Sequence, residues 1–191
     1  MIEAKYLVIS VIGEHADESA DMIFARKIKD TENIGITFWV INSRNAKPEM
    51  VQSLCEYAKN NNEDALAIFI KPSVSGGARP TKTNECSVGF SKDHSNWVAF
   101  PEGIGPVTGR IDRGACALVF SQLKLVQDNI DLRHYADFLN QHKPVRIIQG
   151  SSTICAVEKD MSGNPDVMKS HNRNVVAIGK LHEPYCVWLK K

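Results

Sequence analysis

Apolar and polar residues follow two alternating patterns over the first 71 residues. Three short apolar runs, rich in β-branched and aromatic side chains, predict strands that are buried on both faces; they cover residues 6–12, 36–41 and 65–70. Between them, apolar residues recur at helical spacing over residues 20–28 and 51–58. Strand, helix, strand, helix, strand with short connections predicts a βαβαβ unit with right-handed crossovers and parallel strands.

Strand patterns dominate the rest of the chain. Residues 85–91 and 96–100 flank the turn-forming sequence Lys92-Asp93-His94-Ser95 and predict a β-hairpin inserted after the third strand. One further helix is expected, capped by Asp131 and stopped before Pro144. Five more apolar runs predict strands at 115–120, 145–148, 153–157, 175–178 and 185–189, the last two paired as a terminal hairpin.

These patterns together predict an α/β fold. We expect a mixed, mainly parallel three-layer sheet of doubly wound, Rossmann-like type, with an N-terminal βαβαβ unit, an inserted β-hairpin and a β-rich C-terminus. The 191 residues fit one domain, because no linker, repeat or low-complexity segment divides residues 1–191. A composition of 43% hydrophobic and 24% charged residues is that of a globular protein.

Charge and cysteine content narrow the classes of partner. The 23 Lys and Arg nearly balance the 22 Asp and Glu, so the net charge of +1 does not draw the chain to nucleic acid or anionic membranes. No apolar run reaches the roughly 20 residues of a membrane span, and we expect a soluble, cytoplasmic protein. The five cysteines are scattered and form no Cys-x-x-Cys pair, which predicts buried thiols and no metal site.

A candidate site lies in the loops expected at the carboxyl edge of the parallel strands, where open α/β sheets bind ligands. In the loop 73–82, backbone N–H groups of two glycines can form an anion-binding nest beside two cationic side chains. A second glycine-rich segment, 103–110, is expected to form another wall. The predicted ligand-binding residues are Ser75, Gly76, Gly77, Arg79, Lys82, Asn42, His15 and Arg110. The pattern favours an anionic small molecule, phosphate-bearing or nucleotide-like.

Plainer explanations for the same residues stay open. Glycine and Pro80 also serve any sharp exit from a strand, and Arg110 can form a local ion pair with Asp112. The ionisable residues at 14–17 are explained equally by helix capping. Neither a dinucleotide fingerprint, a P-loop, a nucleophile elbow nor a zinc-protease motif is present, so the sequence identifies no catalytic residues and no cofactor.

Two other functions also stay open. In the first, the chain is a non-catalytic, homo-oligomeric interaction module whose hairpin and C-terminal strands offer an edge for pairing. In the second, it associates with nucleic acid, which requires the cationic residues Arg79, Lys82, Arg110 and Arg113 on one face. Trp97 in the hairpin is a candidate stacking platform for a base, although core packing is the preferred explanation.

Overall fold

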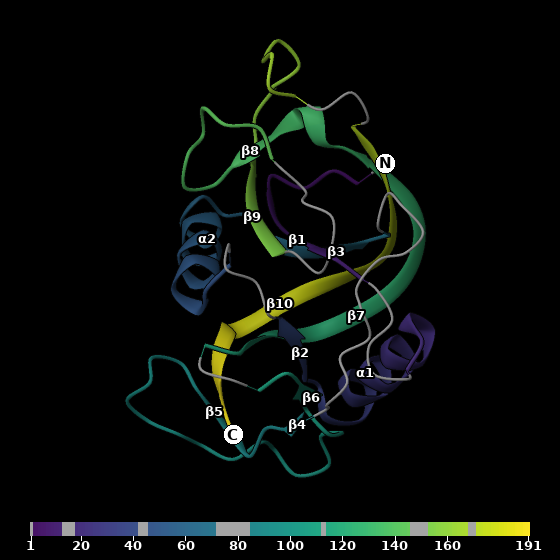
Figure 1. Cartoon of the computed structure of the whole chain (residues 1–191), viewed down its shortest axis with the longest axis vertical. Coiled ribbons are helices and arrows are strands. Elements are labelled where there is room, and N and C mark those ends of the chain that lie inside the picture. The colour runs from purple at the N-terminus through teal and green to yellow at the C-terminus, as the bar shows by residue number, and fades with distance from the viewer. Residues whose placement is uncertain are drawn as a thin grey trace.

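The computed structural model describes residues 2–12, 18–41, 46–71, 85–111, 114–145, 153–167 and 171–191 (Figure 1). The helices are α1 (Ala20–Ile34), α2 (Pro48–Asn60) and the short 3-10 helix η1 (Leu132–His134). The strands are β1 (Tyr6–Val11), β2 (Thr37–Ile41), β3 (Ala65–Ile70), β4 (Glu85–Cys86), β5 (Gly89–Ser91), β6 (Thr108–Gly109), β7 (Cys116–Asp131), β8 (Tyr135–Asp137), β9 (Thr153–Glu158) and β10 (Asn172–Lys190). No helix in these ranges is long and apolar enough to cross a membrane.

Local sequence signals explain the first five elements, which confirm the predicted order of strand and helix. The Ser19 side chain caps α1 by accepting a hydrogen bond from the N–H of Met22 at 3.3 Å. Gly35 ends α1 in the left-handed conformation, with φ of 80°, which glycine adopts without a steric penalty. Pro48 occupies the first turn of α2, where its missing N–H costs no hydrogen bond.

The strands form one mixed sheet of order β2-β7-β10-β3-β1-β9-β8, with β5 added beside β10, and a separate pair of β4 with β6. Among the described strands, only β1 and β3 pair in parallel. The expectation of a mainly parallel sheet was therefore wrong. Instead of joining β1, β2 pairs antiparallel with β7, placing Thr37 opposite Phe120. A continuous apolar run predicts burial on both faces but does not select the neighbouring strand.

The sheet curls strongly. β7 and β8 stand at the second and last positions of the sheet, yet only the three residues of η1 separate them along the chain. The two regions must therefore approach each other, and Figure 1 shows β7 and β10 sweeping in an arc around β1 and β3. An apolar cluster from β1, β3, β9, the end of β7 and β8 fills the enclosed side, including Leu7, Ile68, Ile130, Tyr135 and Ile154.

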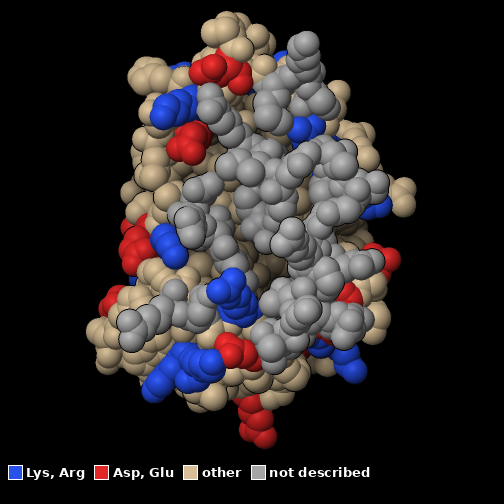
Figure 2. Space-filling model, viewed as in Figure 1, with Lys and Arg blue, Asp and Glu red and all other residues tan. Residues whose placement is uncertain are grey.

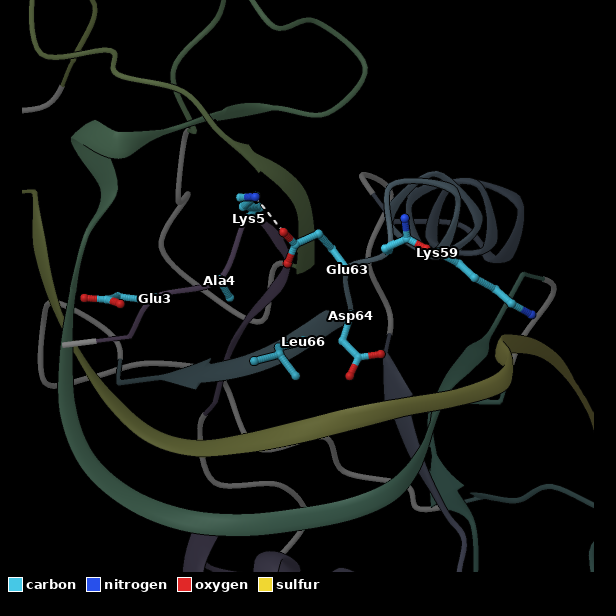
Figure 3. A pocket seen from close by; sticks show the side chains of 8 residues that line it. Glu3, Ala4, Lys5, Lys59, Glu63, Asp64 and Leu66 are labelled. Atoms are coloured by element: carbon cyan, nitrogen blue, oxygen red, sulfur yellow. Dashed lines mark hydrogen bonds and ion pairs between the residues drawn. The ribbon is translucent and has the colours of Figure 1, made fainter.

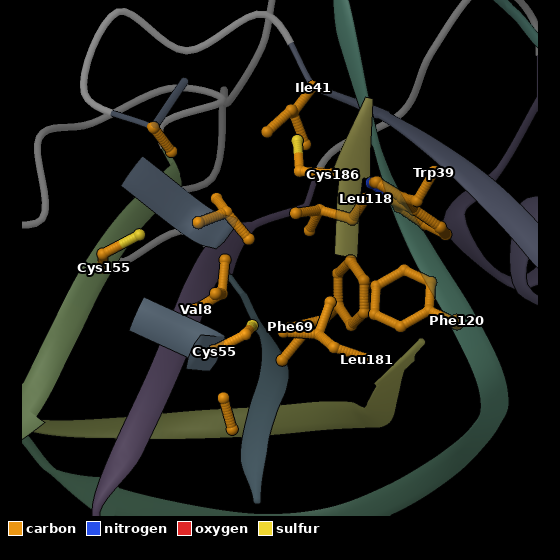
Figure 4. Packing of buried hydrophobic residues seen from close by; sticks show 14 of the residues in the cluster. Val8, Trp39, Ile41, Cys55, Phe69, Leu118, Phe120, Cys155, Leu181 and Cys186 are labelled. Atoms are coloured by element: carbon orange, nitrogen blue, oxygen red, sulfur yellow. The ribbon is translucent and has the colours of Figure 1, made fainter. Parts of the chain in front are cut away.

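Both described helices pack on the outer face of the curled sheet, so they do not cover its two faces as separate layers. Phe69 of β3 is the centre of this packing (Figure 4). Its ring centroid lies 5.3 Å from Phe24 of α1, 4.5 Å from Trp39 of β2 and 5.8 Å from Phe120 of β7. Four rings from four elements thus join α1 to the sheet.

The segment 85–111 covers the opposite face of the β2, β7 and β10 region. Phe38 contacts Phe90 and Phe100 from this segment, with ring centroids 5.0 and 4.9 Å apart. Phe90 and Val98 exchange two backbone hydrogen bonds of 2.9 Å. The predicted hairpin is therefore present as a short antiparallel bridge, and β5 joins the main sheet through β10.

The helix expected between Asp131 and Pro144 is absent, and this prediction was wrong. Asp131 does cap a turn, because its carboxylate accepts a hydrogen bond from the N–H of Arg133 at 3.0 Å. The turn is a single 3-10 turn, and Tyr135 then begins β8 opposite Glu158 of β9. In β8, the backbone groups form their hydrogen bonds with β9 instead of within a helix. The contact with a distant strand therefore outweighed the helical spacing of apolar residues in the local sequence.

The predicted terminal hairpin was also wrong, because residues 172–190 form one long strand, β10. Its pairing with β7 shifts register between Leu181 and Cys186, on either side of Pro184. Proline has no N–H to donate to the ladder, so the strand bends there and continues beside the same partner. The polar residues 179–184 were interpreted as a turn, but they are a bent and irregular part of one strand.

Candidate functional site

Most of the predicted ligand-binding residues, Ser75, Gly76, Gly77, Arg79, Lys82, Asn42 and His15, lie outside the described residues. Two of the loops were expected to leave neighbouring parallel strands at the same edge of the sheet. This arrangement is supported for β1 and β3, which are parallel neighbours with Val11 opposite Ile70. β2 is not their neighbour, since it belongs to the β7 side of the sheet. The described residues at the β1 edge include a buried hydroxyl pair, Ser10 and Thr153, with oxygens 3.1 Å apart.

The second glycine-rich segment, residues 103–110, was expected to form one side of the binding site. It packs against α1. The N–H of Gly105 donates to the Asp30 carboxylate at 3.1 Å, and Arg26 donates to the carbonyl of Pro106 at 2.9 Å. A Cβ at Gly105 would lie 3.2 Å from an Asp30 oxygen, so glycine permits this close approach. Arg110 is exposed just after β6 and is the one predicted site residue that the structure describes.

The densest group of aromatic and cationic side chains among the described residues lies at the C-terminal end of β10. We call it the aromatic-lysine cluster; it comprises Lys47, His94, Trp97, Trp188 and Lys190. The His94 ring stacks on Trp188, with centroids 4.3 Å apart and planes at 29°, and meets Trp97 edge-on at 5.8 Å. Lys47 Nζ lies 5.4 Å from the Trp188 ring centroid, and Lys190 Nζ lies 6.0 Å from that of Trp97.

Strand register and a tight turn bring these residues together. Trp188 lies opposite Ser91, so the turn that follows β5 reaches over the Trp188 ring. Within that turn, Asp93 accepts hydrogen bonds from the N–H and hydroxyl of Ser95, and these bonds lower the pKa of the Asp93 carboxyl. His94 adopts a left-handed φ of 68°, which turns its ring back toward β10.

A glutamine from α2 ties this turn to the rest of the fold. The amide of Gln52 donates to the carbonyls of Lys92 at 3.2 Å and of Cys186 at 2.8 Å. Lys47, which precedes the first turn of α2, also donates to the carbonyl of Gly114 at 3.4 Å. The contacts of Gln52 and Lys47 thus connect the cluster to α2 and to the backbone before β7.

The two tryptophans of the cluster differ in exposure. Trp188 is 8% exposed and belongs to the core, as its apolar strand predicts, and its indole N–H has no hydrogen-bond partner among the described residues. Trp97 is 37% exposed, and its hairpin neighbours Val98 and Val88 are 50% and 65% exposed. Trp97 and the exposed His94 are therefore rings that a ligand can reach, whereas Trp188 is buried.

Positive charge gathers around this end of the molecule. Lys190 and Lys191 end the chain, and Lys191 pairs with Glu85 at 2.5 Å. Figure 2 shows Lys and Arg side chains together in the lower left of the view, where Figure 1 places β5 and the C-terminus. The even overall charge of the chain therefore conceals a local excess of positive charge.

A second group with unusual electrostatics is the buried pair of Lys27 and Asp30 on α1. Lys27 Nζ lies 3.7 Å from an Asp30 carboxylate oxygen and has no hydrogen-bond partner in the described part of the chain. Burial, followed by the nearby charge of Arg26, lowers the pKa of Lys27 to about 8. Asp30 also accepts a hydrogen bond from the Thr37 hydroxyl at 2.7 Å. These contacts join α1 to β2, so we interpret the pair as structural.

The lowered pKa of Lys27 predicts a specific pH dependence of stability. The unfolded chain keeps this proton up to the ordinary lysine pKa of 10.5, whereas the folded chain releases it above about pH 8. Between these values the unfolded state binds more protons, so the Lys27 contribution to stability rises with pH. Urea unfolding of wild type and Lys27→Met across this window should show wild type gaining up to about 1.4 kcal/mol per pH unit relative to the variant. A difference in unfolding free energy between the two proteins that stays constant with pH would contradict the lowered pKa of Lys27.

Four of the five cysteines belong to the apolar cluster between the helices and the sheet, and Figure 4 labels three of them. They come from α2, β7, β9 and β10 and are Cys55, Cys116, Cys155 and Cys186. Burial raises the pKa of the Cys55 thiol to about 12 and raises those of Cys155 and Cys186 as well. These three thiols are therefore neutral near pH 7, as inert core residues are. No three His, Cys, Asp or Glu side chains in the described ranges are placed so that they could hold a metal ion together.

A shallow hollow of about 660 Å³ lies beside the N-terminal ends of β1 and β3 (Figure 3). It is lined by Glu3, Ala4, Lys5, Lys59, Asn62, Glu63, Asp64 and Leu66. Its charges are compensated locally, because Lys5 pairs with Glu63 at 2.5 Å and Lys180 pairs with Asp64 at 2.9 Å. These exposed pairs leave no excess charge for a ligand, and we assign no site to the hollow.

Comparison with protein-family models, with curated protein sequences and with solved structures found no match. The candidate site therefore depends on the geometry of this chain alone. Of its residues, sequence reasoning singled out only Trp97 as a possible ligand platform. Lys47 and Lys190 gave no signal, because they reach the tryptophans through the fold and not through their spacing in the sequence.

Proposed function

We propose that the chain binds an anionic ligand with a planar ring, such as a nucleotide, at the aromatic-lysine cluster. The observation that carries the proposal is the Trp97 ring, which is 37% exposed and has the Lys190 ammonium 6.0 Å from its centre. An aromatic face gives a base a stacking partner, and an adjacent lysine offers a charge partner for phosphate. The proposed ligand is thus the nucleotide-like molecule expected from the sequence, but its proposed site is the aromatic-lysine cluster and not the loop 73–82.

The position of His94 supports a stacking function. Its ring lies against Trp97 on one side and stacks on Trp188 on the other. Trp97 is therefore contacted by the His94 ring and by Lys190 before any ligand arrives. A side chain already held in its binding orientation loses less conformational entropy when it binds, which favours affinity.

Substitution of Trp97 tests the proposal directly. Isothermal titration with ATP and AMP should show binding to wild type, about tenfold weaker binding to Trp97→Ala, and near wild-type binding to Trp97→Phe, which keeps a ring. Tyr57→Ala is the matched control, because Tyr57 is another exposed aromatic residue, 48% accessible, on α2. The proposal fails if wild type binds neither nucleotide or if Trp97→Ala binds as tightly as wild type.

The anion-binding loop expected at residues 73–82 remains a separate proposal. Its support is that β1 and β3 end side by side, which is the arrangement in which such loops bind anions. The same titration with Arg79→Ala tests it. An affinity equal to wild type would remove Arg79 from the site and leave the aromatic-lysine cluster as the binding region.

A homo-oligomeric interaction module is the second candidate function. It is favoured by the exposed apolar side chains of Val88 and Val98, which are 65% and 50% accessible on the hairpin. Sedimentation equilibrium distinguishes the two candidates. A dimer that dissociates in Val88→Lys would favour a second copy of the chain as the hairpin's partner, whereas a strict monomer would count against it.

A further inference from the structure

We infer that the ligand of the aromatic-lysine cluster is a single-stranded nucleic acid, bound as an extended chain and not as a free nucleotide. This inference rests on the proposed function, because it uses the same rings and lysines. It extends that function by naming the class of ligand. Three features of the cluster support it, namely its open shape, the spread of its cations and the accessibility of its ring.

The first feature is that the cluster presents an open platform. Val88 lies on one arm of the hairpin and Trp97 and Val98 on the other, and Trp97, Val98 and Val88 are 37%, 50% and 65% exposed. Sites for small molecules usually enclose most of the ligand surface, whereas these side chains are exposed to solvent. A polymer gains affinity by repeating weak contacts along its length, so it can use an open platform that holds a mononucleotide weakly.

The second feature is the spread of positive charge over three segments. Lys47 precedes α2, Lys92 lies in the turn after β5, and Lys190 and Lys191 end β10 and the chain. Glu85 pairs with Lys191 and offsets its charge, and Asp93 stays ionised, so Lys47, Lys92 and Lys190 supply the excess of positive charge. Cations distributed in this way match a ligand with several phosphates better than a ligand with one.

The third feature favours a single strand over a duplex. The accessible ring is a stacking partner, and stacking on a protein side chain requires a base that is free of its neighbours. In a duplex the bases stack on each other, and their faces are closed to Trp97. Stacking is also independent of base identity, so we expect little sequence preference.

The experiment compares ligands of different length on the intact protein. Fluorescence anisotropy with a labelled oligothymidylate of about 12 nucleotides, a site size typical of such surfaces, measures strand binding. Competition with thymidine monophosphate and with a duplex of equal length measures selectivity. The single strand should bind at least about tenfold more tightly than either competitor, and its affinity should fall steeply with salt.

Three variants and a matched control test whether this binding depends on the cluster. Trp97→Ala should weaken strand binding about tenfold, and Trp97→Phe should restore it. Lys190→Gln should weaken binding and reduce the slope of log affinity against log salt by about 0.7, the value for one phosphate contact on a single strand. Lys124→Gln removes one exposed lysine from β7, away from the cluster, and should change neither quantity.

The outcomes separate this inference from the function on which it rests. Equal affinity for the monophosphate and the oligonucleotide would overturn the strand inference and leave the nucleotide site standing. Preferred binding of the duplex would overturn it as well. Absence of binding to all three ligands would overturn both proposals, and in that case a hairpin-dependent dimer in sedimentation would identify the platform as a protein interface.

Discussion

Replacing Asp30 with alanine should lower the free energy of unfolding by about 3 to 5 kcal/mol, the range for breaking a buried ion pair by removal of one partner. The Asp30 carboxylate accepts hydrogen bonds from the Thr37 hydroxyl and the Gly105 N–H, and it lies 3.7 Å from Lys27 Nζ. The variant leaves Lys27 buried without a counter-charge and two donors without an acceptor. It also removes the hydrogen bonds through which Asp30 joins α1 to Thr37 of β2 and to Gly105.

A double-mutant cycle tests this explanation. Equilibrium unfolding in urea of Asp30→Ala, Lys27→Met and the double variant measures the coupling between the two residues. We expect the double variant to be more stable than Asp30→Ala alone, because the uncompensated charge has been removed. Asp21→Ala is the control, since Asp21 is an exposed carboxylate on the same helix. Additive losses would show that the pair is not coupled.

Replacing Gly179 with alanine should destabilise the protein by about 3 kcal/mol, near the upper end of the usual range for overpacking a core. Gly179 lies in β10 between Ala67 of β3 and Leu123 of β7. An added Cβ would lie 2.5 and 2.6 Å from two ring carbons of Phe120. The Phe120 ring is fully buried and packs on Phe69, so it cannot move aside without disturbing the aromatic centre of the core.

The measurement is again equilibrium unfolding, with Gly163→Ala as the matched control. Gly163 has no heavy atom within 4 Å of the position of an added Cβ, so its replacement should change stability by a few tenths of a kcal/mol. Combining Gly179→Ala with Phe120→Leu, which removes the clashing ring carbons, should cost less than the sum of the two single changes. A Gly179→Ala protein as stable as wild type would show that the ring has room to shift.

The strands and helices of the N-terminal part were predictable because their signals are local. Apolar runs such as 65–70, caps such as Ser19 and first-turn prolines such as Pro48 act within a few residues of the chain. The pairing of strands was not predictable in the same way. β2 pairs with β7 and not with β1. Both β1 and β7 contain apolar runs that favour burial on both faces, so their local sequences do not decide which of them pairs with β2.

The errors in the C-terminal part have a related cause. Leu132, Tyr135 and Ala136 fit a helical face, yet they lie in η1 and β8, where β9 supplies the pairing partner. Pro184 marks a bend within β10, although prolines in such polar segments usually mark turns. In both places a long-range partner decided between conformations that local sequence leaves nearly equal in energy.

The sequence by itself determined which segments are strands and helices in the N-terminal part, the presence of a mixed sheet, and the burial of the cysteine-containing apolar runs. It also offered Trp97 as a candidate stacking platform, although it preferred core packing for this ring. Only the tertiary structure decided that Trp97 lies beside Lys190 and His94, because strand register and the bend of β10 bring these residues together. Burial is encoded in local patterns of side chains, whereas the assembly of a site depends on contacts between distant segments.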